Sequence, residues 1–177
     1  MKLFAAALFA GLLLVPAGAR AETSLSSYET VHGALLSLWS ELPLTARNAS
    51  LTEGPATGFG SFTPAPHTSF TEDEPIHVYV EVLGYGWRDK GDGTVAVELD
   101  ADLMLMGADG VTLARQDKFL STDIVSREKR LETFLAFEAN LSGFAPGEYE
   151  LRYRLTDRVT GKTTEFGLPI TLSAAEE

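Results

Sequence analysis

Between Pro75 and the C-terminal end of the chain, apolar side chains recur at every second position, which is the period of a β-strand. The clearest run, 95–106, places Val, Leu and Ala on one face and mainly carboxylates and methionines on the other. Similar runs cover 76–83, 111–119, 131–141, 149–156 and 164–172. Strands at this spacing, with no helical pattern between them, predict a mainly β fold: an antiparallel, immunoglobulin-like β-sandwich over 75–173 with one face of each sheet in water.

Residues 24–42 carry the one strong helical period of the chain. Apolar residues recur there every three or four positions and form a single stripe, made of Leu25, Tyr28, Val31, Leu35, Leu38 or Trp39, and Leu42. Ser26-x-x-Glu29 matches a capping box, and Pro43 ends the pattern. We therefore expect an amphipathic helix within 22–43. Its stripe either docks on the sandwich or pairs with another chain.

The segment 44–74 differs in composition from its neighbours. Its central part, 52–64, is rich in Gly, Pro and Thr and holds two aromatic residues, Phe59 and Phe62. Such a composition favours turns and an irregular edge strand. Because the segment is too long for an ordinary connection, we expect it either to pack over the sandwich or to be functional.

The first 21 residues have the three parts of a secretory signal peptide. Lys2 supplies the positive charge, residues 3–15 form an apolar run, and Ala19-Arg20-Ala21 matches a cleavage site. The apolar run is shorter than the ~20 residues that a membrane-spanning helix needs. We expect cleavage after Ala21 and no lasting membrane anchor.

The chain contains no cysteine. A lipid-carrying cysteine and disulfide bonds are both excluded, so the 156 residues left after cleavage must fold by burial alone. Small secreted eukaryotic domains usually depend on disulfides. The composition therefore indicates a bacterial protein that is periplasmic or secreted.

The chain is acidic, with 14 Lys and Arg against 25 Asp and Glu. Loss of Lys2 and Arg20 with the signal peptide changes the formal net charge from −11 to −13. Nucleic acids and anionic lipids select cationic surfaces. Nucleic acid is therefore not expected as a partner.

The run 146–157, Pro-Gly-Glu-Tyr-Glu-Leu-Arg-Tyr-Arg-Leu-Thr-Asp, followed by Thr160-Gly161-Lys162, resembles the final hairpin of bacterial immunoglobulin-like or fibronectin-III-like exported domains. The run 74–81 is similar to the opening strand of such modules. With 51–55, the chain resembles an uncharacterised family of exported proteobacterial proteins. The resemblance implies a β-sandwich and transfers no functional residue, because these motifs specify strands and turns.

No catalytic or metal-binding constellation stands out. His32, His67 and His77 lie in different segments, and His77 is ~13 Å along the predicted strand from Glu81, too far to share one ion. The segment 89–93 lacks the ligand spacing and the flanking helices of a calcium loop. Cysteine and a Gly-x-Ser-x-Gly motif are both absent. We expect no catalytic residue, no metal ligand and no cofactor, and therefore no enzymatic activity.

Aromatic residues in loops are the best binding candidates. Tyr85 and Trp87 directly follow a predicted strand, and Phe59 and Phe62 lie in the Gly/Pro-rich segment. Exposed rings suit sugars, peptides or a partner protein, although the same rings could fold back and cap the sandwich. The sequence thus predicts a non-enzymatic binding or structural module of the bacterial envelope, whose partner is an envelope protein or a glycan. The alternative is a small carbohydrate-active protein, a glycan binder or hydrolase, that uses these aromatics.

Overall fold

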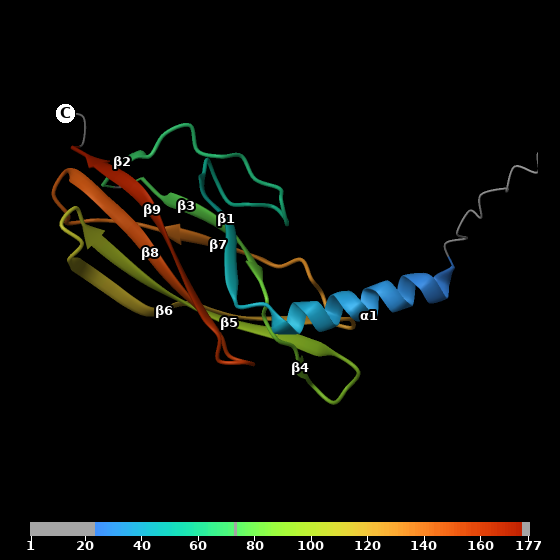
Figure 1. Cartoon of the computed structure of the whole chain (residues 1–177). Coiled ribbons are helices and arrows are strands. Elements are labelled where there is room, and N and C mark those ends of the chain that lie inside the picture. Colours follow the sequence, from blue (N-terminus) through green and yellow to red (C-terminus); the bar gives the residue numbers. More distant parts are fainter. Residues whose placement is uncertain (1–23, 73, 175–177) are drawn as a thin grey trace, which may run out of the picture.

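The computed structural model describes residues 24–72 and 74–174 (Figure 1). The predicted signal peptide, 1–21, lies outside these residues. In the part of the chain that the structure describes, one helix precedes nine strands: α1 Leu25–Glu41, β1 Thr45–Thr52, β2 Ser69–Thr71, β3 Ile76–Leu83, β4 Arg88–Asp89, β5 Val95–Gly107, β6 Thr112–Ser126, β7 Phe134–Ala139, β8 Gly147–Asp157 and β9 Thr163–Ser173. Within the described residues, no helix has the length and apolar content needed to cross a bilayer.

The strands form two sheets. The smaller has the order β1-β3-β7, and the larger has the order β2-β9-β8-β5-β4. β6 also pairs with β5, along the edge opposite β8. Every pairing is antiparallel except that of β2 with β9, which is parallel. A single core draws on both sheets, with Ile76, Val78 and Val80 from one and Leu99, Leu151 and Leu155 from the other. The predicted mainly β sandwich with a leading helix is confirmed.

The hairpin β8–β9 follows its alternating sequence closely. Leu151, Tyr153 and Leu155 are fully buried, whereas Arg152 and Arg154 lie on the outer face. Gly161, at φ 75°, sits in the connecting turn, where a positive φ favours glycine. A local period of two and a glycine-containing turn therefore suffice to define this hairpin.

The segment 44–74 supplies an edge strand to each sheet, β1 and β2, and its Gly/Pro-rich part packs against the outer face of the smaller sheet. Phe62 stacks on Tyr79 of β3 at 4.2 Å between ring centroids. The backbone N–H of Gly60 donates to the Tyr79 hydroxyl at 2.7 Å. The Gly/Pro-rich part therefore packs over the sandwich.

The expectation that each sheet has one wet face is wrong for β3 and β5. On β3, Tyr79 and Glu81 of the outer face are as buried as the core valines, because the 53–64 segment and β1 cover them. On β5, the outer carboxylates Glu98 and Asp100 are 6% and 8% exposed. Buried carboxylates require compensation by cations or hydrogen-bond donors.

Cations from β4 and from the turn after β8 compensate the carboxylates of β5. Arg152 and Arg154, on the neighbouring strand β8, pair with Glu150 and Glu165. Glu98 instead contacts Arg88 on β4 at 2.8 Å, and Asp100 contacts Arg158 at 3.0 Å. The turn after β8 returns Arg158 to β5, and sequence spacing does not reveal that approach.

Glu81 joins β3 to β1. The Arg47 guanidinium binds its carboxylate at 2.5 Å, and the Tyr79 hydroxyl donates to it at 3.3 Å. Burial alone raises the pKa of Glu81, but hydrogen bonds from Asn48 and Arg47 outweigh that effect and hold the pKa below its usual value. A lowered pKa means that the ionised carboxylate stabilises the fold. That stabilisation is complete above the pKa of unfolded glutamate and is lost as pH falls through the lower folded-state pKa.

We predict that Glu81→Gln lowers the free energy of unfolding by about 1–3 kcal/mol at pH 7, the range for a lost hydrogen bond to a charged group. The difference from the unchanged chain should shrink as pH falls below about 4.3, the pKa of unfolded glutamate, toward the lower pKa of the native carboxylate. Urea denaturation at pH 7 and pH 3.5 measures both values. Glu165→Gln, in an ion pair whose carboxylate is 40% exposed, is the control and should cost under about 1 kcal/mol. Equal losses for the two variants at pH 7 would contradict the role given to Glu81.

Candidate functional site

The helix α1 is held to the sandwich at its C-terminal end. Trp39 is its one buried residue, and the indole Nε1–H donates to the carbonyl of Tyr85 at 3.0 Å. The Trp39 ring also packs edge-on against the Tyr85 ring, with centroids 5.1 Å apart, and lies 6.2 Å from the Trp87 ring. These contacts fix the last turn of the helix on the loop that follows β3.

That loop is itself rigidly held. The Tyr85 hydroxyl donates to the carbonyl of Arg130 at 2.9 Å, and it lies 2.9 Å from the Thr133 hydroxyl. The fully buried carboxylate of Asp157 accepts from the backbone N–H of Gly86 at 2.8 Å. Tyr85 and Gly86 are thereby tied to the end of β8 and to the segment before β7. The loop residues that support Trp39 are therefore held in place by the sandwich.

Lys162 closes the C-terminal end of α1. Its Nζ donates to the carbonyls of Ser40 at 3.1 Å, Leu42 at 2.6 Å and Gly84 at 3.1 Å. The last carbonyls of a helix have no partner within the helix and carry partial negative charge, so a cation there satisfies both needs. The ammonium thus joins the helix end, the loop after β3 and the β8–β9 turn.

The helix begins at a different cap from the one expected. Ser24 is the N-cap, and its hydroxyl accepts from the backbone N–H of Ser27 at 3.1 Å. The predicted capping box, Ser26 with Glu29, is wrong because the helix starts two residues earlier and Ser26 is already within it. The end before Pro43 agrees with the prediction, since Leu42 is the C-cap.

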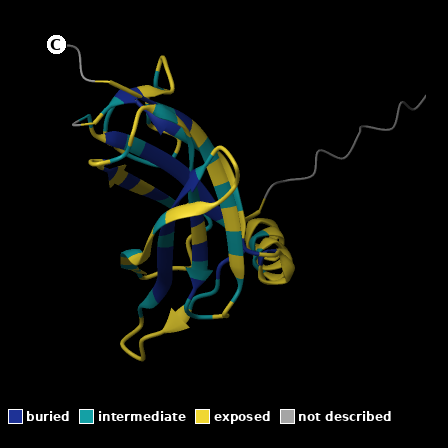
Figure 2. Ribbon diagram, turned by 90° about the vertical axis from the view of Figure 1, so that its left-hand side faces the viewer, coloured by how far each residue is buried: buried dark blue, intermediate teal, exposed yellow. Residues whose placement is uncertain are grey.

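From this anchor the rest of α1 projects away from the sandwich (Figures 1 and 2), and nearly all of it is exposed. The exposed side chains include most of the apolar stripe: Leu25, Tyr28, Val31, Leu35, Leu38 and Leu42, with exposed fractions from 42% to 73%. Soluble proteins rarely leave a contiguous set of large apolar residues uncovered unless the set is an interaction surface. The exposed stripe of α1 is therefore the leading candidate functional site.

The four aromatic residues predicted as binding candidates do not form one site. Tyr85 is only 1% exposed, so the expectation that its ring is free is wrong: the ring is packed under Trp39. Trp87 is half-buried, and the Nζ of Lys129 lies 5.4 Å from the centre of its ring. These two rings lie at the C-terminal end of α1 that is attached to the sandwich, which we call the foot of the helix. The spacing of Tyr85 and Trp87 in the sequence does not reveal their contact with Trp39.

Phe59 and Phe62 lie elsewhere, in the segment that covers the smaller sheet. Both are half-buried. Phe62 lines a shallow depression of about 500 Å³ whose other lining residues are Glu53, Gly54, Pro55, Thr57, Ser61 and Thr63. The depression combines one aromatic ring with hydroxyls and a carboxylate, a combination that suits a polar, ring-shaped ligand.

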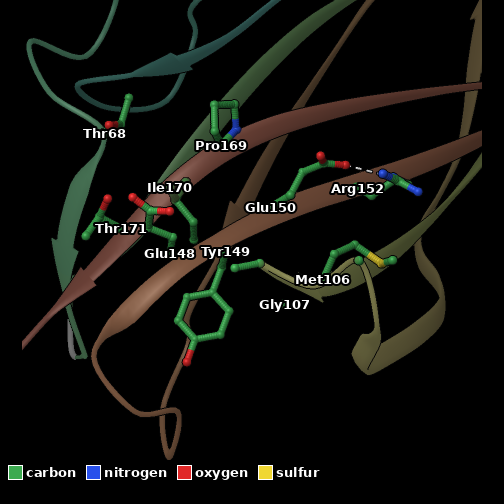
Figure 3. A pocket seen from close by; sticks show the side chains of 12 residues that line it. Thr68, Met106, Gly107, Glu148, Tyr149, Glu150, Arg152, Pro169, Ile170 and Thr171 are labelled. Carbon is green, nitrogen blue, oxygen red and sulfur yellow. Dashed lines mark hydrogen bonds and ion pairs between the residues drawn. The ribbon is translucent and has the colours of Figure 1, made fainter.

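A second depression, of about 410 Å³, lies over β8 and β9 beside the β5–β6 turn (Figure 3). Two of its charged side chains form an ion pair: the Glu150 carboxylate points to the Arg152 guanidinium and accepts a 2.7 Å hydrogen bond from its Nε. The carboxyl group fits there because Gly167 has no side chain, and a Cβ at that position would lie 2.4 Å from Glu150 Oε1. The other polar side chains in its lining are those of Thr68, Glu148, Tyr149 and Thr171.

Among the described residues, no three His, Asp or Glu side chains lie close enough together to hold a metal ion. The hydroxyl of Tyr153 is buried without a hydrogen-bond partner between the rings of Phe137 and Phe166, and this burial raises its pKa. A group held in its neutral form within a stack of aromatic rings serves packing.

Comparison with known proteins adds little to this description. No protein-family model matches the chain, and no curated protein matches its sequence. A crystal structure of a Niemann-Pick type C2 protein from the Japanese carpenter ant aligns over 75% of this chain and 94% of its own, at 10% identity and a TM-score of 0.46. The C-terminal domain of wzt aligns over 79% and 86%, at 12% identity and a TM-score of 0.40. At these TM-scores neither likeness assigns a function.

We predict that Gly84→Ala releases the foot of α1. Gly84 has φ 77°, and a Cβ there would lie 2.2 Å from the carbonyl oxygen of Pro43. The substitution should cost about 1–2 kcal/mol for the backbone conformation and about 1–3 kcal/mol more for the clash. Urea denaturation measures the loss, and a red shift of the tryptophan fluorescence should report exposure of Trp39.

Gly91→Ala is the matched control for this prediction. Gly91 has φ 78°, and a Cβ there would meet no other atom within 4 Å, so this variant shares the backbone cost and lacks the clash. Equal losses of stability for the two variants, with no fluorescence change in either, would show that Gly84 does not hold the helix.

Proposed function

We propose that this chain is an exported, periplasmic or secreted, non-enzymatic binding module that docks onto another protein through α1. The observation that carries the proposal is the contrast between the two ends of the helix. Its foot is fixed by Trp39 and Lys162, whereas its apolar stripe is exposed. A preorganised helix loses little conformational freedom on binding, so more of the gain from apolar burial becomes affinity.

Helix-in-groove or helix-to-helix recognition is the mode that this geometry fits. Both modes use apolar anchors at i, i+3, i+4 and i+7, and Val31, Leu35 and Leu38 have this spacing. Export is supported by the sequence alone, through the signal peptide and the absence of cysteine. The acidic composition and the absence of Lys and Arg from 25–42 favour a protein over an anionic membrane as the partner.

We predict that a photo-reactive benzoylphenylalanine at Leu35 or Leu38 cross-links the exported chain to a protein in its native host. The stripe places these two positions within a docked interface, so irradiation should give one discrete adduct on a gel. The chain in that adduct should begin at Glu22 if export removes the signal peptide as proposed.

The same probe at Ser26 or Ser37 is the control, because both residues are exposed on the opposite side of the helix. Adducts of equal yield from all four positions, or no adduct from Leu35 and Leu38, would overturn docking through the stripe.

A second candidate function is glycan binding at the depression lined by Phe62. The observation that favours it is a half-buried ring held flat by Tyr79 and surrounded by Thr57, Ser61 and Thr63. Aromatic faces next to hydroxyls and carboxylates suit sugar rings.

We predict for this candidate that Phe62→Ala weakens binding of soluble cell-wall glycan fragments at least about tenfold, the equivalent of ~1.4 kcal/mol, in calorimetric titration. Trp87→Ala removes a ring outside the depression and should leave the affinity unchanged. Absence of heat with every fragment, or an equal loss in both variants, would exclude this depression as a glycan site.

A further inference from the structure

The exposed part of the α1 stripe has the spacing of a helix-pairing seam. Tyr28, Val31, Leu35, Leu38 and Leu42 follow one another at intervals of three, four, three and four residues. At 100° per residue they cover an arc of roughly 80°. A narrow stripe with alternating three- and four-residue spacing is the pattern by which one helix packs along another.

The sandwich of the same chain does not cover this seam. Trp39, the buried residue of α1, lies on the adjoining arc, as do the half-buried Leu36 and His32. The His32 ring stacks on the Tyr28 ring of the seam, with centroids 5.8 Å apart. The five seam residues have exposed fractions from 42% to 68%. Figure 2 shows the helix nearly end-on, with its surface mostly exposed. The seam is therefore available to another helix.

The charges on α1 permit a second copy of the same helix. Only Glu29 and Glu41 carry formal charge between residues 25 and 42. Glu29 lies on the polar side of the helix, and the positions that flank the seam include the uncharged Ser27 and Ala34. Two copies of the seam can therefore pack together without like charges facing each other along most of their length.

The charge of the sandwich decides the direction of pairing. A parallel pair would place two strongly acidic sandwiches side by side, since both are attached at the C-terminal end of α1. An antiparallel pair separates them by about the ~26 Å length of a 17-residue helix. That separation exceeds the Debye length of ~8 Å at physiological ionic strength. Antiparallel packing also aligns the two helix dipoles favourably.

The apolar area that the seam can bury limits the affinity of the helix pair. Five side chains exposed to this extent offer roughly 500 Å² per copy and about 1,000 Å² for the pair, at the lower limit for a specific interface. Such an area fits a reversible dimer whose dissociation constant is in the micromolar range.

We propose that α1 pairs antiparallel with α1 of a second copy of this chain, and that the exported protein is a reversible homodimer with its two sandwiches at opposite ends. This inference rests on the proposed function and names the docked protein. With the pair centred near residue 33, Tyr28 of one copy lies opposite Leu38 of the other, and Val31 lies opposite Leu35.

Sedimentation velocity of the purified exported chain between 1 and 200 µM tests the association. The unchanged chain should shift from monomer to dimer across this range. The double variant Leu35→Glu/Leu38→Glu should weaken association at least about 30-fold and remain monomeric. Ser26→Glu/Ser37→Glu adds the same charge on the opposite side of the helix and should dimerise like the unchanged chain. Because all four residues are exposed, circular dichroism should show the same fold in every variant.

The absence of cysteine allows a direct test of direction. A mixture of Tyr28→Cys and Leu38→Cys chains should form a mixed disulfide under a mild oxidant, whereas Tyr28→Cys alone should not cross-link. Efficient cross-linking of Tyr28→Cys to itself would overturn the antiparallel arrangement.

Two further outcomes separate this inference from the proposed function. A chain that is monomeric at 200 µM, together with a cross-linked adduct in cells whose mass is not that of two copies, would overturn self-pairing and leave docking through α1 intact. A monomeric chain with no adduct from Leu35 or Leu38 would overturn both.

Discussion

The burial of the Trp39 indole on Tyr85 determines how the rest of α1 is presented. A helix of 17 residues is marginally stable in water when isolated. Here its last turn is held by the indole, and its final carbonyls are bound by Lys162. With one end satisfied in this way, the helix can extend from the sandwich without further support. The position of every stripe residue therefore follows from a few contacts at the foot.

These contacts constrain the sandwich in turn. Gly84 must be glycine because the chain of Pro43 passes directly over it, and Tyr85 must be held by Thr133 to support the indole. The carboxylate of Asp157 accepts hydrogen bonds from Gly86, Val159 and Thr160. Maintaining the shape of this junction is thus a task shared by the loop after β3, the segment before β7 and the β8–β9 turn.

The sequence predicts local periods well and distant contacts poorly. The strands from 76 to 172 and the helix within 22–43 emerge from patterns of two and of three to four residues, which each element carries in itself. Burial of Glu81 and Glu98 depends on Arg47 and Arg88, which lie on other strands, and an alternating pattern of carboxylates resembles a wet face when these partners are unknown. β6 extends to Ser126, through a polar stretch that has no strand period of its own, because pairing with β5 supplies its hydrogen bonds.

In the candidate site, too, the sequence predicts the local pattern but not the distant contacts. The apolar stripe of α1 can be read from the sequence, but its exposure cannot, since that depends on where the foot of the helix is attached. Aromatic residues after a strand resemble a binding loop, so the sequence leaves open whether Tyr85 and Trp87 are free or fold back on the sandwich. The burial of Tyr85 depends on Trp39, 46 residues away along the chain. Lys162 gives no sequence signal at all, because a lysine in a turn is ordinary until a helix ends against it.

An exposed apolar stripe normally favours aggregation, and the composition of the remaining chain limits that risk. The formal net charge of −11 makes two sandwiches repel each other when they approach closely. The same repulsion is weak when the sandwiches are separated by the length of α1, because salt screens it over that distance. The negative charge of the sandwiches therefore opposes their disordered clustering, but it permits contact between the apolar stripes of two projecting helices. The charge of the sandwich and the apolar face of the helix together favour association through the helices over association through the sandwiches.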